Sequence, residues 1–225
     1  MSEDRIRPRE RVGAAVARPG GPILFCAPLG PVGRLMVRRL RKQGRRVEFV
    51  ARPSDAAPQP RRIHPLPQSP CSGFVLELPA PSGVAGPADG GRGAGWGAAI
   101  RAATIEPFEV LRAAGAACRR GGGGTIVLVV PAPPATGDRV AAVVARAAAV
   151  TLLRGVARGL PDTVQITGVV LPDDQGSRLT QVRHEAASLA CWLLENAPGL
   201  NGRILWMGPA RWESPMDRIV RWDLG

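Results

Sequence analysis

Residues 21–52 read GPILFCAPLGPVGRLMVRRLRKQGRRVEFVAR, and this stretch decides the fold class. An apolar run at residues 22–27 has the length of a strand, and a Pro/Gly turn follows it. Residues 32–43 carry apolar side chains at helical spacing, with the basic side chains off that stripe. Gly44 ends this predicted helix, and residues 46–51 predict a second strand. A strand, a helix and a strand in this order indicate a parallel β-α-β unit.

The same alternation continues towards the C-terminus. Further strands are predicted at residues 73–78 (the third or fourth of the sheet), 125–130, 164–171 and 203–207. Further helices are predicted at residues 96–120 (bent or restarted at Pro107), 138–158 and 178–196. The fold class is therefore α/β: a Rossmann-like, doubly wound parallel sheet with helices on both faces. One domain spans residues 22–208, between a basic N-terminal arm at 1–21 and a C-terminal tail at 209–225.

Composition excludes several kinds of chemistry. The 225 residues contain no tyrosine, Lys42 is the only lysine, and the two histidines are His64 and His184. A tyrosine proton donor is therefore excluded, and a lysine Schiff base could use only Lys42. No CxxC pair is present, and the four cysteines are Cys26, Cys71, Cys118 and Cys191. We expect reduced thiols and no bound metal.

The net charge of +12 is concentrated near the N-terminus. Residues 1–62 hold 15 Arg and Lys against 5 Asp and Glu, a net of +10, which leaves +2 for the rest. This asymmetry is a signal of polyanion binding. The excess of arginine over lysine, with much Ala, Gly and Pro, equally fits the codon bias of a GC-rich genome. The N-terminus has no apolar leader, and no apolar stretch reaches the ~20 residues of a membrane span. We expect a cytoplasmic protein without a membrane or nucleic-acid partner.

The order and spacing of these elements resemble the short-chain dehydrogenase/reductase family over residues 22–208. The stretch quoted above resembles the family's first strand, phosphate turn, helix and second strand. Residues 105–130 resemble the long helix that leads into the fifth strand. Residues 146–172 resemble the helix that carries the catalytic lysine and the strand after it, and residues 187–208 resemble the final helix and strand.

The family's phosphate turn, T-G-x-x-x-G-x-G, aligns with residues 26–33, where only the last glycine, Gly33, is kept. Ala27 adds a Cβ where the backbone would approach a pyrophosphate, and Pro31 lacks an N–H. Arg52 follows the second strand, where an arginine can hold a 2′-phosphate. The segment G-P-V-G can equally be a plain helix start with Pro31 in its first position. We expect this chain to bind no cofactor beyond weak residual NAD(P) binding.

The family's catalytic positions are also replaced. Its tyrosine and lysine lie four residues apart on a helix, where the tyrosine passes the proton and the lysine holds the nicotinamide ribose. In register, these positions hold Ala142 and Arg146, the serine position holds Val130 or Pro131, and the asparagine position lies near Ala103. Arg146 keeps a charge but is not a tunable amine. The family's substrate-covering lid has no room before the last helix, so the resemblance implies a fold retained without catalysis.

The predicted helix over residues 140–156 is apolar around most of its circumference. It is therefore either buried within the domain or shared with a neighbouring subunit. In the family this helix belongs to a four-helix bundle between subunits, and the final helix and strand form a second interface. The apolar C-terminal tail adds tryptophans typical of interfaces. The interface residues that we expect are Val144, Ala148, Leu152, Trp206, Trp212 and Trp222.

The resemblance implies a non-catalytic subunit that stabilises a catalytically intact homologue, most simply in a heterotetramer. The NAD(P) would be bound by that partner, and the complex would act on a β-hydroxyacyl-CoA thioester in the degradation of aromatic compounds. One alternative is a dinucleotide-sensing or polyanion-binding regulator that uses the basic arm and residues 34–46. Another is a reductase that works through Asp138, Asp173 and His184, although nothing in the sequence gathers these residues.

Overall fold

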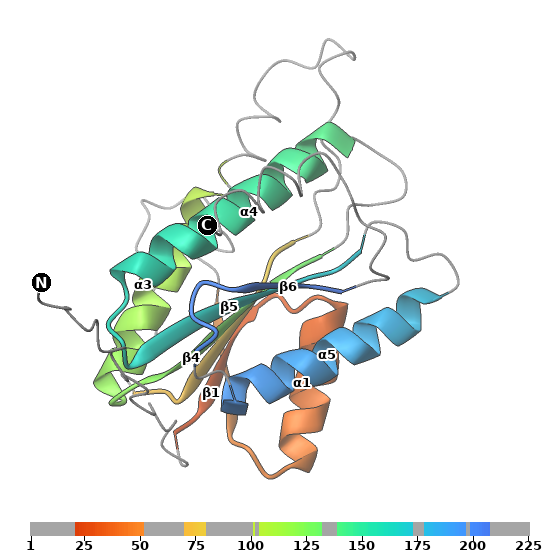
Figure 1. The fold of residues 1–225 in the computed structure, drawn as a ribbon. Helices are drawn as coiled ribbons and strands as arrows, with labels where there is room; N and C mark the ends of the chain where they lie inside the picture. The colour runs from red at the N-terminus through yellow and green to blue at the C-terminus, as the bar shows by residue number, and fades with distance from the viewer. Residues whose placement is uncertain are drawn as a thin grey trace, which may run out of the picture.

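The computed structural model describes residues 21–51, 70–79, 101, 104–131, 139–172, 178–196 and 199–207. Within the described residues, six parallel strands form one sheet in the order β2-β1-β3-β4-β5-β6. Helices cover both faces of this sheet (Figure 1). The predicted α/β class, a Rossmann-like and doubly wound parallel sheet, is therefore confirmed.

The element bounds follow the sequence pattern closely. The strands are β1 (Ile23–Ala27), β2 (Val47–Ala51), β3 (Gly73–Glu77), β4 (Gly124–Val130), β5 (Val164–Val170) and β6 (Ile204–Trp206). The helices are α1 (Pro31–Lys42), α3 (Ile105–Arg120), α4 (Arg139–Gly159) and α5 (Leu179–Asn196). The predicted ends agree to within one residue except at the start of α3. There Pro107 lies in the first turn, which is where the chain tolerates a proline, and residues 96–100 lie outside the described part.

The chain winds outward in both directions from β1. Strand β2 pairs with one edge of β1, and β3 pairs with the other edge, next to β4. The segment at residues 73–77 is thus the third strand of the chain and a central strand of the sheet. The strand order reverses between β1 and β3, and ligands of open α/β sheets bind outside the carboxyl ends of the strands at such a point.

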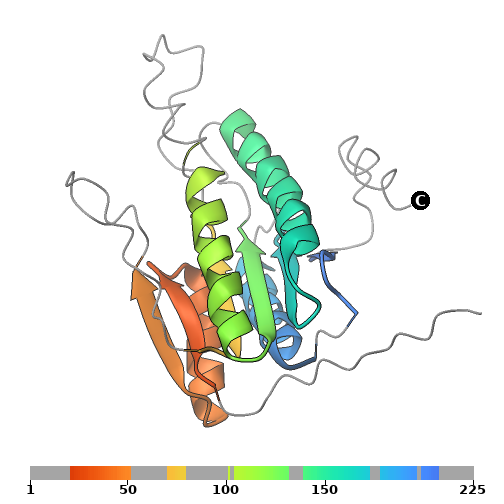
Figure 2. The ribbon, with the colours of Figure 1, turned by 90° about the vertical axis from the view of Figure 1, so that its left-hand side faces the viewer.

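Two layers of helices enclose the sheet. Helices α1 and α5 cover one face, and α3 and α4 lie side by side over the other (Figures 1 and 2). Because side chains of a strand alternate between faces, Ile23 and Phe25 of β1 join the core beneath α1 and α5. Leu24 and Cys26 join the core beneath α3 and α4. Both faces of the central strands are buried, as expected for a parallel sheet.

Helix α1 forms because its apolar side chains share one stripe. Val32, Met36 and Leu40 are buried against the sheet, while the basic residues of the helix are exposed. Gly44 follows the helix with φ of 74°, a left-handed conformation that glycine adopts without strain, as the sequence predicted. Among the described helices, none combines the length and apolar character needed to cross a membrane.

Within the described residues, helix α4 is buried along one side only. Its buried side chains are Ala149, Val150, Leu153 and Ala157, of which Ala149, Leu153 and Ala157 join the core on this face of the sheet. Val144, Ala148 and Leu152 are half-buried, and Val143 is 43% exposed. The apolar circumference predicted from the sequence is therefore not enclosed by the described part of the domain.

Candidate functional site

A glutamate stands at the switch point of the sheet. Glu77 is the last residue of β3 and pairs in register with Val129 of β4. Alternation along β3 places Val75 in the core beneath α1 and α5, and Glu77 follows it on the same side two residues later. Only 3% of Glu77 is exposed, so its carboxylate lies within the protein beneath the start of α1.

The carboxylate of Glu77 accepts hydrogen bonds from the first turn of α1. The N–H of Val32 donates to Oε1 at 3.2 Å, and the N–H of Gly33 donates to Oε2 at 2.6 Å. These N–H groups have no partner inside the helix because they belong to its first turn. They also lie at the positive end of the helix dipole, which favours an anion. The N-terminus of α1 therefore binds an anion that is part of the same chain, the carboxylate of Glu77.

Two glycines let the carboxylate approach. A Cβ on Gly30 would overlap Oε1 and the carboxyl carbon of Glu77, and a Cβ on Gly33 would lie 2.8 Å from Oε2. Gly33, which the sequence alignment placed at the last glycine of the phosphate turn, thus lies beside the carboxylate of Glu77. Pro31 is the first residue of α1, as the plain helix-start interpretation predicted, and Ala27 ends β1. Arg52 lies outside the described residues.

Arg146 lies at the same carboxyl edge of the sheet, beside the ends of β5 and β6. Its Nη2 donates a hydrogen bond of 3.0 Å to the carbonyl oxygen of Leu171, which directly follows β5. The Cζ atom of its guanidinium lies 4.7 Å from the ring centroid of Trp206, the last residue of β6. Arg146 is thus held by a carbonyl and an aromatic face at the carboxyl ends of two strands.

The other family positions carry no polar side chain. Val130 ends β4 and is buried, with Pro131 directly after it. Ala142 lies in α4, although its side chain is outside the described part, and Ala103 is outside it altogether. Strand β5 ends at Val170 and helix α5 begins at Leu179, so residues 171–178 join them.

The residues proposed for an independent reductase are not gathered in the described structure. His184 is exposed on α5, whereas Asp138 and Asp173 lie outside the described residues. Within the described ranges, no group of three or more His, Cys, Asp or Glu residues could hold a metal ion.

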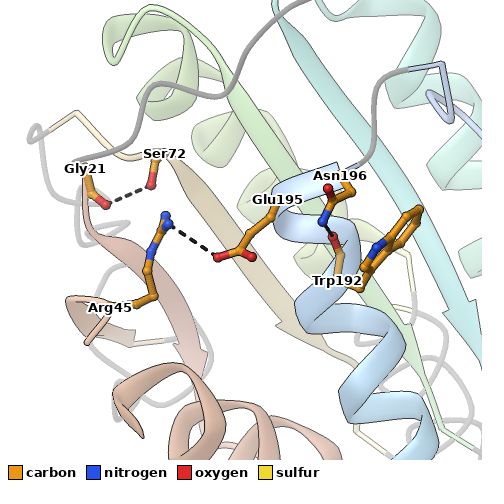
Figure 3. Close-up of polar contacts among 6 residues, drawn as sticks. All are labelled: Gly21, Arg45, Ser72, Trp192, Glu195 and Asn196. Carbon is orange, nitrogen blue, oxygen red and sulfur yellow. Dashed lines mark hydrogen bonds and ion pairs between the residues drawn. The ribbon is translucent and has the colours of Figure 1, made fainter. Parts of the chain in front are cut away.

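The basic surface of α1 makes contacts within the chain. Arg45, just after the helix, donates to Glu195 of α5 at 3.3 Å (Figure 3). Arg39 donates to Ser188 of α5, and the guanidinium of Arg41 lies 5.5 Å from the ring centroid of Phe49. Part of the positive charge that signalled polyanion binding therefore supports the packing of α1 on its neighbours.

The structure brings together two cysteines that lie far apart in the sequence. The Sγ atoms of Cys71 and Cys118 are 3.5 Å apart and buried. The hydrogen bond from Cys118 lowers the pKa of Cys71, against burial, and the charge of Arg120 adds to this lowering. The hydrogen bond with Cys71 and burial both raise the pKa of Cys118. All four cysteines are free, as the sequence predicted.

The expected interface residues lie in different environments. Trp206 is 42% exposed but also covers Arg146, so part of its ring serves the chain's own fold. Trp212 and Trp222 lie outside the described residues. Sequence reasoning missed Trp192, which is 51% exposed on α5 between the buried Cys191 and Leu193. It also missed Glu77, whose signal was a single charge in the apolar segment at residues 73–78.

Comparison with known proteins identifies solved structures that have a similar fold. Neither a protein-family model nor a curated protein sequence matches the chain. A short chain dehydrogenase from Mycobacterium smegmatis aligns over 88% of this chain and 95% of its own, with a TM-score of 0.63 and 17% identity. An Escherichia coli hydroxysteroid dehydrogenase aligns over 86% and 98%, with a TM-score of 0.60 and 13% identity.

A third solved structure is an oxidoreductase of the short-chain dehydrogenase/reductase family from Brucella ovis, in complex with a partially ordered NAD. It aligns over 84% of this chain and 99% of its own, with a TM-score of 0.59 and 15% identity. The described chain therefore has the fold of the short-chain dehydrogenases/reductases, with a carboxylate and a guanidinium of its own at the edge where that fold binds its ligands.

Proposed function

We propose that this chain is a non-catalytic subunit that assembles with a catalytically intact homologue of the same fold in an NAD(P)-dependent dehydrogenase. The observation that carries the proposal is the placement of Arg146. At the helix position of the family's lysine, its charge is engaged by the Leu171 carbonyl and the Trp206 ring. The chain contains no tyrosine that could pass a proton at this place. This arrangement supports the fold and offers no proton path to a substrate.

The surface of α3 and α4 supports assembly with a partner. Phe108 and Ile105 on α3 are each 46% exposed, and Val143 on α4 is 43% exposed. The two helices lie side by side (Figure 2), so these side chains belong to one helical layer. Val144 and Ala148, also on α4, are half-buried. Exposed apolar area of this kind favours a second helical layer, such as the matching helices of a homologue.

We propose that the partner binds the NAD(P) and that the complex oxidises a β-hydroxyacyl-CoA thioester. The sequence pattern resembles the silent subunit of 2-(hydroxy(phenyl)methyl)succinyl-CoA dehydrogenase, which is the basis for this substrate class. The tail at residues 209–225 would add Trp212 and Trp222 to the contact with the partner. Removal of this tail should then weaken assembly.

Co-purification from the source cells tests the proposal. The tagged chain should bring down a homologue that has both the tyrosine and the lysine of the family, identified by mass spectrometry. The purified chain alone should oxidise no alcohol with NAD or NADP, whereas the complex should. A chain that is a stable homo-oligomer by itself and turns over a substrate would overturn the proposal.

A substitution on α4, with a matched control, tests the contact surface. Val144→Glu places a charge among the half-buried apolar side chains and should abolish co-purification. Gln43→Glu adds the same charge at an exposed position at the end of α1, on the other face of the sheet, and should leave assembly intact. Equal co-purification by both variants would exclude this face of α4 from the interface.

A further inference from the structure

We infer that Glu77 is the built-in ligand of a latent pyrophosphate site, and that its carboxylate closes this site to nucleoside diphosphates and dinucleotides. The inference deepens the proposed function, because it gives a structural reason for the expected lack of cofactor binding in a non-catalytic subunit. The inference depends on the proposed function in one respect only, namely that this site is not used in catalysis. The geometry of Glu77 is independent of any partner.

The position of the carboxylate is that of an anion bound at a helix N-terminus. Both of its oxygens accept N–H groups, from Val32 at 3.2 Å and from Gly33 at 2.6 Å. The same N–H groups, at the start of the helix after the first strand, face the pyrophosphate in dinucleotide-binding proteins of this architecture. Glu77 reaches them from the carboxyl end of the neighbouring strand β3, at the switch point of the sheet.

Space and charge both exclude a second anion. Gly30 and Gly33 give room for one anionic group close to the backbone, and the Glu77 side chain fills that room. Like charges at such short range in a buried place repel strongly. A pyrophosphate can therefore enter only where the Glu77 carboxylate is removed.

The site remains able to bind an anion once Glu77 is shortened. The N–H groups of Val32 and Gly33 belong to the helix and do not depend on the glutamate for their direction. Gly30 still presents no side chain to the vacated space. Glu77→Ser would leave these N–H groups to water, and an anion would then bind with the help of the helix dipole. The ligand class is the diphosphate group, as in inorganic pyrophosphate or ADP.

The test compares the full-length chain with three variants by thermal shift and calorimetric titration with inorganic pyrophosphate, and then with ADP. Glu77→Ser should bind pyrophosphate about ten-fold or more tightly than the unsubstituted chain. Glu48→Ser is the matched control: it also removes one carboxylate, from β2, where Glu48 pairs with Arg46 at 2.7 Å. It should bind pyrophosphate with the same affinity as the unsubstituted chain. This control measures any gain in affinity that comes only from removing one negative charge from a basic protein. Gly30→Ala combined with Glu77→Ser refills the space and should abolish the gain.

Glu77→Gln keeps the shape of the side chain and removes its charge, so it carries the test if Glu77→Ser does not fold. It should show a smaller gain in the same direction. Equal pyrophosphate affinity in the Glu77 variants and in the Glu48 control would overturn the inference. So would tight pyrophosphate or dinucleotide binding by the unsubstituted chain. Neither result depends on co-purification, so the latent site and the proposed partnership fail independently.

Discussion

Gly30 and Glu77 compete for the same space: a Cβ on Gly30 would overlap the carboxylate that caps α1. The glycine precedes the helix as its N-cap residue, with φ of −72°, a conformation open to any residue. Its small size is therefore required by the glutamate and not by the backbone. This dependence of a loop residue on the end of a neighbouring strand couples two segments that are far apart in the sequence.

The first prediction is a coupling between these two residues. Gly30→Ala should lower the free energy of unfolding by about 1–3 kcal/mol, the usual effect of overpacking a buried place. In the Glu77→Ser background the same substitution should cost less, with a coupling of about 1 kcal/mol or more. Urea unfolding of the two single variants and the double variant measures this coupling.

A glycine in α4 provides the control for this cycle. A Cβ on Gly155 would have no atom within 4 Å, so Gly155→Ala should be neutral or stabilising by about 0.5–1 kcal/mol. Strict additivity of Gly30→Ala and Glu77→Ser would show that Glu77 does not lie against Gly30.

The second prediction concerns Arg146. Arg146→Met removes the hydrogen bond to the Leu171 carbonyl and the cation over the Trp206 ring. We expect a loss of about 1–2 kcal/mol in the free energy of unfolding. Arg146→Lys should recover only part of it, because an ammonium lacks the planar face that stacks on the indole.

A double-variant cycle separates the stacking from the hydrogen bond. Trp206→Leu removes the ring and keeps apolar bulk at the end of β6, so its coupling with Arg146→Met should be about 0.5–1 kcal/mol. A coupling near zero in urea unfolding would mean that the ring and the guanidinium do not interact in solution.

Local patterns were sufficient to predict the elements of this fold. Periodicity and Pro/Gly punctuation located β1, α1 and β2 from residues 21–52, because each element buries a stripe or a face that the sequence displays. The right-handed crossover rule then indicated a doubly wound sheet, whereas the order of its strands came from the structure. The helix restart expected near Pro107 agrees with α3 beginning at Ile105, which places Pro107 in the first turn; the upstream part of the predicted helix, at residues 96–100, lies outside the described residues.

The contents of the site could not be predicted in the same way. The partners of Glu77 depend on β3 lying beside β1, which sets its last side chain under α1. Arg146 meets Trp206 only because β6 adds to β5 in a fixed register. Such contacts depend on tertiary pairing, which periodicity does not encode. Composition, by contrast, needs no tertiary pairing, and it alone excludes a tyrosine proton donor.

The third prediction is a loss of stability at alkaline pH that depends on Cys191. Burial raises the pKa of the Cys191 thiol from 9.0 to about 11 in the folded chain, against the charge of Arg39. Since the folded pKa is the higher one, the stabilisation is complete below pH 9.0 and is lost as the pH rises towards about 11. Urea unfolding across this range should therefore show a falling free energy of unfolding.

Cys191→Ala removes the titrating group from both states. Its free energy of unfolding should be lower at neutral pH because a buried side chain is truncated, but it should fall less steeply across the same alkaline range. Parallel curves for the variant and the unsubstituted chain would assign the alkaline loss to other groups.

The fourth prediction is that a mild thiol oxidant joins Cys71 to Cys118. The Sγ atoms are 3.5 Å apart, and a disulfide needs them at about 2.05 Å, so a small approach of the segment before β3 to α3 suffices. The lowered pKa of Cys71 favours its thiolate as the attacking group. Diamide would accept the electron pair and both protons as the bond forms.

The bond would close a loop of 47 residues and could stabilise the chain by up to about 4 kcal/mol. Peptide mapping after diamide treatment should find Cys71 linked to Cys118, with Cys26 and Cys191 still alkylated after unfolding. Cys118→Ser should remove both the link and the gain in melting temperature. A disulfide that pairs Cys71 with any other cysteine, or a lowered melting temperature in the linked chain, would contradict the proximity of these thiols.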